Sequence, residues 1–243
     1  AACGAEGTSV IYNAAREPEI VDLQALLRSM GARVNGAGGS IITVEGGVAL
    51  HGCTHRVIGD RIVCATYLCA AAAAGGEVRL TGVDYRAVST VALSLAESGC
   101  EVRSEADAVS LRSTGALRSV RPVRTAPYPG FPTDAQPVLM AALLRSEGCT
   151  VFVENIFENR YRHVDELSRM GAEIRVAVVN GVRTLHGAAV KCTDLRGGAA
   201  LVIAGLSAEG TTRVTELTHI DRGYDAIERD LAALGAQIRR ETT

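Results

Sequence analysis

Hydrophobic and polar positions follow two different periods along this chain. Thr150–Val153 alternates between polar and apolar residues in the way typical of a half-buried strand. Farther on, Val164, Leu167 and Met170 recur at the spacing that places apolar side chains on one helix face, and His163 falls on the polar face. The pattern predicts a strand followed by an amphipathic helix.

Glycine and aspartate mark where the predicted elements end and begin. Met170-Gly171-Ala172 places a glycine at a helix C-terminus, where only glycine adopts the left-handed conformation at little cost. Two further strands are predicted at Glu173–Val176 and Arg183–Leu185, giving a β-α-β-α-β-β unit. A second helix in each unit is expected to begin at an aspartate suited to the N-cap: Asp60, Asp134 and Asp194.

This unit repeats along the chain. The helix-ending glycine recurs roughly every 70 residues, in Met30–Ala32, Ser98–Cys100, Met170–Ala172 and Leu234–Ala236. A strand-opening glycine precedes each copy by about two dozen residues, for example in Glu6-Gly7-Thr8 and Glu209-Gly210-Thr211. The repeat predicts a mixed α/β fold. It also predicts that the chain begins in the last turn of a helix, as part of a longer protein, and that its C-terminal unit is nearly complete.

Composition and charge exclude several classes of protein. The 243 residues are 47% hydrophobic with a formal net charge of −2, so the surplus of cations that a nucleic-acid partner requires is absent. No run approaches the roughly 20 apolar residues of a membrane span, and we expect no membrane partner. The seven cysteines are odd in number and contain no C-x-x-C pair, which indicates reduced thiols and a cytoplasmic protein.

One segment has the composition of a metal site without its spacing. His51, Cys53 and His55 lie close together in sequence, but they match no standard zinc pattern and fall between two repeats. We therefore predict no metal and no cofactor.

The candidate chemistry lies in loops that precede helices. Arg160 and Arg222 occupy the same offset in the third and fourth repeats, and Arg196 follows Asp194 at a helix start. A guanidinium beside the N–H groups of a helix start suits a phosphate or carboxylate ligand. The alternative interpretations are a plain N-cap for Asp134 and Asp194 and a solvated or salt-bridged side chain for each arginine.

A proline-rich segment favours a functional role for one of these aspartates. Three of the six prolines fall within Pro127–Pro132, which restricts the backbone to extended geometry just before Asp134. A stiff loop that ends in a carboxylate can position a general base against a substrate hydroxyl.

Several longer motifs resemble one family of enzymes. They are Asn13–Asp22, Pro127–Asp134, Phe157–Arg160 followed by His163-Val164, Thr193–Arg196 and His219–Tyr224. Together they resemble the UDP-N-acetylglucosamine 1-carboxyvinyltransferase family of enolpyruvyl transferases over essentially the whole chain. The resemblance implies an inside-out α/β barrel built from βαβαββ repeats and incomplete at the N-terminus. It also implies that residues 1–59 are the last repeat of an otherwise missing UDP-sugar-side domain and that residues 60–243 form a three-repeat domain.

The resemblance also implies substrates and residue roles. The reaction would transfer the enolpyruvyl group of phosphoenolpyruvate to the 3′-hydroxyl of UDP-N-acetylglucosamine and release phosphate, the first committed step of peptidoglycan synthesis. Asp134 would accept the hydroxyl proton, and the backbone of Ile156 would contact the UDP-sugar. Arg160 and Arg222 would hold the carboxylate and phosphate of the donor. Asp194 and Arg196 would line the same pocket.

Departures from the family pattern leave alternatives open. Where the family has Asp-Arg-Ile-Glu-Thr-Gly-Thr, the segment Asp60–Thr66 carries Val63 and Cys64. The Lys-Asn pair, loop cysteine and phosphate-binding arginine of the family's N-terminal half are absent, so this chain alone is expected to be inactive. Besides the enolpyruvyl transferase, an inactive UDP-sugar-binding paralogue or gene fragment and the related shikimate-pathway transferase remain as hypotheses.

Overall fold

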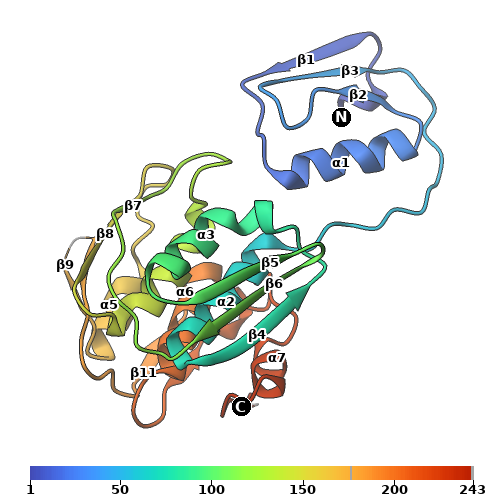
Figure 1. Ribbon diagram of the computed structural model, residues 1–243. Coiled ribbons are helices and arrows are strands. Elements are labelled where there is room, and N and C mark those ends of the chain that lie inside the picture. Colours follow the sequence, from blue (N-terminus) through green and yellow to red (C-terminus); the bar gives the residue numbers. More distant parts are fainter. Residues whose placement is uncertain (176, 242–243) are drawn as a thin grey trace. The chain divides into compact units, whose positions relative to one another are not determined.

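The computed structural model describes residues 1–175 and 177–241 and divides the chain into two compact units. The small unit comprises Ala1–Gly59 together with Pro127–Gly130. The large unit comprises Asp60–Ala126 and the described residues from Phe131 onward. Figure 1 shows both, with the small unit at the N-terminal, blue end of the colour scale.

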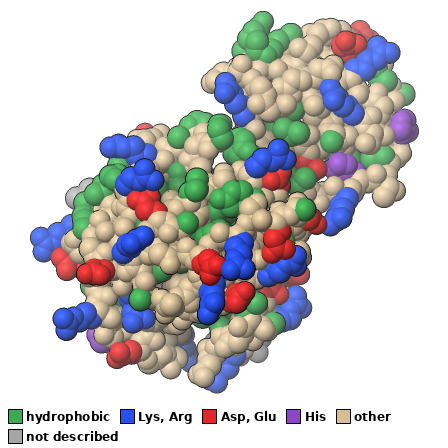
Figure 2. Space-filling view, in the orientation of Figure 1, with side chains coloured by type: hydrophobic (Ala, Val, Ile, Leu, Met, Phe, Trp, Pro, Cys, Tyr) green, Lys and Arg blue, Asp and Glu red, His purple; other side chains and the backbone are tan. Residues whose placement is uncertain are grey.

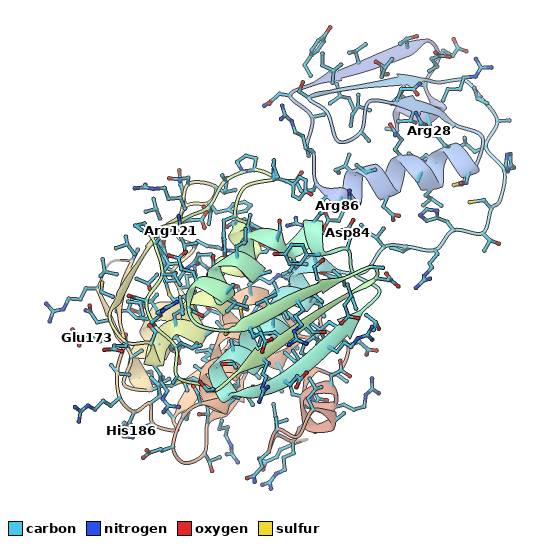
Figure 3. The ribbon with its side chains drawn as sticks, viewed as in Figure 1. Arg28, Asp84, Arg86, Arg121, Glu173 and His186 are labelled. Carbon is cyan, nitrogen blue, oxygen red and sulfur yellow. The ribbon has the colours of Figure 1, made fainter. Side chains whose placement is uncertain are left out.

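The small unit is one three-stranded sheet and one helix. Its elements are η1 (Ala2–Gly4), β1 (Thr8–Tyr12), α1 (Pro18–Ser29), β2 (Arg33–Asn35) and β3 (Ile41–Glu45). The strands pair antiparallel in the order β1-β3-β2, and Val34, Ile42 and Val44 are among the residues of a small core. Arg28 of α1 donates from Nε to the carbonyl of Val34 at 2.6 Å, which ties the helix to β2 (Figure 3).

Three helices lie against one another at the centre of the large unit. They are α2 (Arg61–Ala74), α4 (Gln136–Ala142), which continues into η3 (Leu143–Arg145), and α6 (Leu195–Leu206). All of α4 is buried, and alanine and glycine supply much of the buried surface of α2 and α6. Small side chains allow close approach of the helix backbones, so the helices form the interior and the sheets lie outside them (Figure 1).

The sheets of the large unit follow the repeat. The first contains β4 (Gly76–Thr81), β5 (Glu101–Glu105) and β6 (Ala108–Ser113) in the order β4-β6-β5, with α3 (Tyr85–Glu97) between β4 and β5 in sequence. The second contains β7 (Val123–Arg124), β8 (Cys149–Val153), β9 (Glu173–Arg175) and β10 (Val178–Asn180) in the order β7-β8-β10-β9, with α5 (His163–Arg169) between β8 and β9 in sequence. The third pairs β11 (Ala189–Lys191) with β12 (Arg213–Thr215) in parallel, and η4 (Leu217–His219) and α7 (Ile227–Ala233) follow.

The repeat predicted from glycine spacing is confirmed. Gly31, Gly99, Gly171 and Gly235 all have positive φ, between 90° and 109°, immediately after the helix of each repeat. In the antiparallel sheets β1-β3-β2 and β4-β6-β5, and in the antiparallel part β8-β10-β9 of the four-stranded sheet, the strand that comes last in sequence lies between the other two. The α/β class and the helices-inside arrangement are likewise confirmed.

One of the predicted strands is misplaced. The last strand of the third repeat is β10, and not Arg183–Leu185, which runs as an irregular segment. β10 begins at Val178 and pairs antiparallel with both β8 and β9, so the pairing partner of these strands comes earlier in sequence than the alternation suggested. Val176, which the prediction placed at the end of β9, lies outside the described residues.

The outer face of the β4-β6-β5 sheet is covered by ion pairs. Arg79 contacts Glu105 at 2.6 Å, and Arg103 contacts Glu101. Figure 2 shows acidic and basic side chains interleaved over this surface. Within the described part of the chain, no helix combines the length and apolar character of a membrane span.

Candidate active site

Asp134 lies at the start of the central helix α4 and is held by two arginines. It belongs to the 3-10 turn η2 (Thr133–Ala135), and the N-cap of α4 is Ala135, without a side-chain cap. Its Oδ1 accepts from Arg160 Nη2 at 2.6 Å, and its Oδ2 accepts from Arg196 Nε at 3.2 Å. The N-cap prediction is therefore wrong for this residue, because its carboxylate binds guanidinium groups instead of helix N–H groups.

Both arginines are largely removed from solvent. The side chain of Arg160 is 19% exposed and that of Arg196 is 11% exposed, while Asp134 is 38% exposed. Arg160 also lies over the ring of Phe157, with Cζ 5.6 Å from the centroid. Burial opposes the charged form of Arg196, but the neighbouring Tyr224 and Asp134 more than offset this, so the pKa of its guanidinium lies above the ordinary value.

The three charged groups leave unused donors. Arg160 Nε and Arg196 Nη1 are buried and have no hydrogen-bond partner among the described residues. Two cations face one carboxylate, so the cluster carries a net positive charge. Buried donors without an acceptor cost about 1–3 kcal/mol each, and an anion supplying oxygen atoms to both would remove that cost.

Asp194 fixes the start of the helix that carries Arg196. Its Oδ1 accepts from the backbone N–H groups of Arg196 at 3.1 Å and Gly197 at 2.8 Å, as the N-cap prediction required. A Cβ at Gly197 would lie 2.8 Å from Asp194 Oδ2 and 3.0 Å from the Cβ of His163. Glycine at this position therefore lets α5 approach the first turn of α6.

Glu154 organises the loop after β8 and was not singled out by sequence reasoning. Its Oε1 accepts from Thr125 Oγ1 at 2.9 Å and from the N–H groups of Ile156 at 2.8 Å and Phe157 at 3.1 Å. Its Oε2 accepts from Thr133 Oγ1 at 2.9 Å, next to Asp134. One carboxylate thus links the segment that carries Asp134 to the loop that leads to Arg160. Its position directly after a strand was the only signal in the sequence.

Two predicted site residues do not touch this cluster. The side chain of Ile156 is 38% exposed, and its N–H is used by Glu154. Arg222 is exposed and forms no ion pair or hydrogen bond with any residue that the structure describes. The structure therefore brings Asp134, Arg160 and Arg196 together, places Asp194 beside them as a helix cap and leaves Arg222 apart.

His163 is buried, contrary to the polar face assigned to it. It is 1% exposed, and neither ring nitrogen has a hydrogen-bond partner among the described residues. Burial lowers the pKa of His163 to about 4, with Asp194 opposing and Arg160 reinforcing the shift. The imidazole is neutral at ordinary pH, which avoids a third positive charge beside the two arginines.

The remaining sequence candidates pack as structural groups. Val63 and Cys64 lie in the first turn of α2 against the core, and burial raises the pKa of the Cys64 thiol to about 12. His55 Nε2 lies 3.0 Å from Asp22 Oδ1 in the small unit. Across residues 1–175 and 177–241, no group of three or more His, Cys, Asp or Glu side chains has the arrangement of a metal site.

Comparison with known proteins identifies a matching family and related sequences. A family model described as EPSP synthase (3-phosphoshikimate 1-carboxyvinyltransferase) matches residues 1–231. A UDP-N-acetylglucosamine 1-carboxyvinyltransferase of Gluconacetobacter diazotrophicus is 52% identical, covering 99% of this chain and 58% of its own length. One of Symbiobacterium thermophilum is 51% identical, covering 99% of this chain and 55% of its own length. The chain thus spans less than three fifths of these relatives.

Solved structures show the same fold. The enolpyruvyl transferase NikO from Streptomyces tendae superimposes with a TM-score of 0.84 at 29% identity, covering 100% of this chain and 58% of that one. An EPSP synthase from Acinetobacter baumannii superimposes with a TM-score of 0.71 at 19% identity, covering 98% of this chain and 59% of that one.

Proposed function

Since this chain belongs to the EPSP synthase (3-phosphoshikimate 1-carboxyvinyltransferase) family, we propose that it is part of an enolpyruvyl transferase that acts on UDP-N-acetylglucosamine and phosphoenolpyruvate. The choice of acceptor rests on relatives about 50% identical that carry the name UDP-N-acetylglucosamine 1-carboxyvinyltransferase. The observation that carries the chemistry is the Asp134 carboxylate between two buried guanidinium groups with unused N–H donors. This reaction would place the protein at the peptidoglycan branch of metabolism and in the cytoplasm.

The donor substrate matches the charge of the cluster. Phosphoenolpyruvate carries a carboxylate and a phosphate, and Arg160 and Arg196 offer donors to both kinds of group. Buried guanidinium groups stabilise developing negative charge more strongly than exposed ones, because little water screens them. Arg222, on the turn before α7, would add a third cation once a substrate is bound. No metal is needed to neutralise the donor.

Asp134 would accept the proton of the acceptor hydroxyl. In the proposed step the 3′-oxygen of the sugar bonds to C2 of phosphoenolpyruvate, its proton passes to Asp134, and C3 gains a proton from a group outside this chain. The resulting tetrahedral ketal returns one C3 proton to that group and breaks its C2–O bond to phosphate, which leaves the enol ether and free phosphate. Glu154 would fix the position of Asp134 through Thr133.

Asp194 and Ile156 would act at the edge of the same site. Asp194 accepts hydrogen bonds from the backbone N–H groups of Arg196 and Gly197. It would thereby fix the backbone from which the Arg196 guanidinium extends. The carbonyl of Ile156 lies in the loop that Glu154 organises, and we propose that the main chain there contacts the UDP-sugar. The other half of the substrate-binding site would come from the part of the relatives' length that this chain does not span.

Substrate discrimination tests the proposal. The full-length protein should release phosphate from phosphoenolpyruvate only when UDP-N-acetylglucosamine is present, and should be inert with shikimate 3-phosphate. Phosphate release from phosphoenolpyruvate with shikimate 3-phosphate, and not UDP-N-acetylglucosamine, as the acceptor would assign the protein to the shikimate pathway. Binding of UDP-N-acetylglucosamine without turnover would support the inactive paralogue and overturn the catalytic proposal.

A further inference from the structure

Tyr224 lies directly beneath the guanidinium group of Arg196. The Cζ atom of Arg196 is 5.4 Å from the centre of the tyrosine ring, within the range of a cation–π contact. Tyr224 is 3% exposed, although it ends the loop that carries the exposed Arg222. The ring therefore forms one wall of the space that Arg196 occupies.

The phenol hydroxyl belongs to a chain of hydrogen bonds with a defined direction. Thr66 Oγ1 donates to the carbonyl of Ile62 at 2.8 Å, within α2. Thr66 Oγ1 and Tyr224 Oη are 2.8 Å apart, and Thr66 is 1% exposed. Each hydroxyl has a single hydrogen. Because Thr66 gives its hydrogen to Ile62, Tyr224 must donate to Thr66.

This direction leaves the phenol oxygen as an acceptor. Its lone pairs are unused by Thr66, and the adjacent Arg196 has a buried Nη1 that lacks a partner. Burial raises the pKa of Tyr224, so the phenol stays neutral and keeps the hydrogen that it donates to Thr66. A small adjustment of the guanidinium would complete a path from Arg196 through Tyr224 and Thr66 to Ile62.

We propose that Tyr224 and Thr66 are positioning residues that hold Arg196 in the orientation required to bind the anionic donor substrate. The inference rests on the proposed function and adds two residues to which that function gave no role. An arginine side chain loses rotamer entropy when it is fixed. A ring face and an acceptor, both anchored to α2, would fix it before the substrate arrives.

Under this proposal, the segment Asp60–Thr66 at the start of α2 supports the position of Arg196. Asp60 caps the helix by accepting from Ile62 N at 2.7 Å and Val63 N at 3.0 Å, which secures the turn whose carbonyl receives Thr66. Val63 and Cys64, the two departures from the family pattern, lie on the same turn without entering the hydrogen-bond chain. Their substitution is compatible with a working site.

Kinetics of the full-length protein test the positioning. Tyr224→Phe keeps the ring and removes the acceptor, so the KM for phosphoenolpyruvate should rise by about threefold to tenfold, the range expected for one lost hydrogen bond, with a smaller change in kcat. Thr66→Val should raise this KM by a smaller factor, and Thr66→Ser should restore it. In an Arg196→Lys background, Tyr224→Phe should have no further effect, because the residue it positions is gone.

A neighbouring tyrosine supplies the matched control. Tyr67 follows Thr66 on α2 and is buried, and its hydroxyl donates to Asp230 Oδ2 at 2.7 Å. Tyr67→Phe removes an equivalent hydroxyl and should leave the KM for phosphoenolpyruvate unchanged. An equal KM in the Tyr224→Phe and Tyr67→Phe variants would overturn the proposal. So would an undiminished effect of Tyr224→Phe in the Arg196→Lys background.

A spectroscopic readout separates this inference from the proposed function. In arginine-labelled NMR spectra, slow rotation of a fixed guanidinium resolves its Nη signals. We expect resolved signals for Arg196 in the wild type and in Tyr67→Phe, and averaged signals in Tyr224→Phe. Resolved signals in all three would overturn the positioning role whatever the enzyme's substrate. Absence of turnover with phosphoenolpyruvate in the wild type would overturn the proposed function alone.

Discussion

At the scale of single residues, the decisive feature is how charge is distributed around Asp134. Arg160 and Arg196 approach its two oxygens from different helix starts, and the neutral His163 is buried beside them. A third buried cation would repel the arginines, whereas the desolvated, uncharged imidazole does not. The stability of the fold should therefore depend on the protonation of His163.

We expect the free energy of unfolding to fall as pH decreases from about 6.5 to about 4. The pKa of His163 lies at about 4 in the folded protein, below the ordinary value near 6.5 that applies to the unfolded chain. Between these values the unfolded chain binds a proton that the folded protein excludes, so acid favours unfolding. Thermal melting across this range would measure the effect.

A matched pair of variants isolates the contribution of this imidazole. His163→Leu should flatten the acid-side decline of the melting temperature, whatever its effect at neutral pH. His186→Leu removes an exposed imidazole (Figure 3) and should leave the decline as steep as in the wild type. Equal pH profiles in wild type and His163→Leu would show that the histidine is not the source.

Sequence reasoning found the charged residues of the cluster but not their arrangement. Asp134 stood out because three prolines precede it, and Arg160 and Arg196 because they flank helix starts. Their contacts join residues 26 and 62 positions apart, which no local pattern records. His163 was misassigned because helical periodicity compares neighbours within α5, whereas its side chain faces the first turn of α6, where Gly197 allows a close approach.

At the scale of elements, the start of α6 is the most constrained point near the candidate site. Asp194 caps the helix, Gly197 permits the approach of His163, and Arg196 lies between them in sequence. The cap was predictable, since an aspartate before an apolar run is a strong N-cap signal. The same reasoning was wrong for Asp134, where a 3-10 turn separates the aspartate from the helix.

Replacement of Gly197 by alanine should destabilise the protein by about 1–3 kcal/mol. The new Cβ would lie 2.8 Å from Asp194 Oδ2 and 3.0 Å from His163 Cβ, so α5 or the cap must move. Gly205 on the same helix is the control, because the atoms nearest to its added Cβ belong to the Thr212 side chain, at 3.2 Å and beyond. Alanine there gains helix propensity, and the net change should stay within about 1 kcal/mol.

Denaturant unfolding of both variants measures this difference. The Gly197→Ala variant should also bind phosphoenolpyruvate more weakly, since Arg196 is displaced with the helix start. Comparable free energies of unfolding for the two variants would show that the space beside Gly197 is less restricted than its surroundings indicate.

At the scale of the whole molecule, the repeat determines the architecture. The four helix-ending glycines predicted the α/β class because each repeat places its own helix and strands by local rules. The position of β10 was not predictable in this way, because its antiparallel pairing with β8 and β9 starts at Val178, earlier in sequence than the alternation suggested. The assignment of residues 1–59 to a domain completed elsewhere stays a prediction.

Cysteine labelling tests the packing of the large unit. Cys64, Cys69, Cys100 and Cys192 are buried, whereas Cys53 and Cys149 are exposed. Burial raises the pKa of Cys192 to about 11 and that of Cys64 to about 12, so few of these thiols are ionised at neutral pH. Mass-spectrometric mapping should find Cys53 and Cys149 labelled first and the buried four labelled only after denaturation. Labelling of Cys69 as fast as Cys149 would contradict the packing of α2.

The role of Asp134 is tested most directly by UDP-N-acetylglucosamine-dependent phosphate release from phosphoenolpyruvate, measured with the full-length protein and its Asp134→Asn variant. Asparagine keeps the shape of the side chain and removes its ability to accept a proton. We expect turnover in the wild type and a loss of at least about a hundredfold in kcat in the variant, with phosphoenolpyruvate still bound by the two arginines. A kcat within about threefold of the wild-type value would contradict the assignment of Asp134 as the proton acceptor.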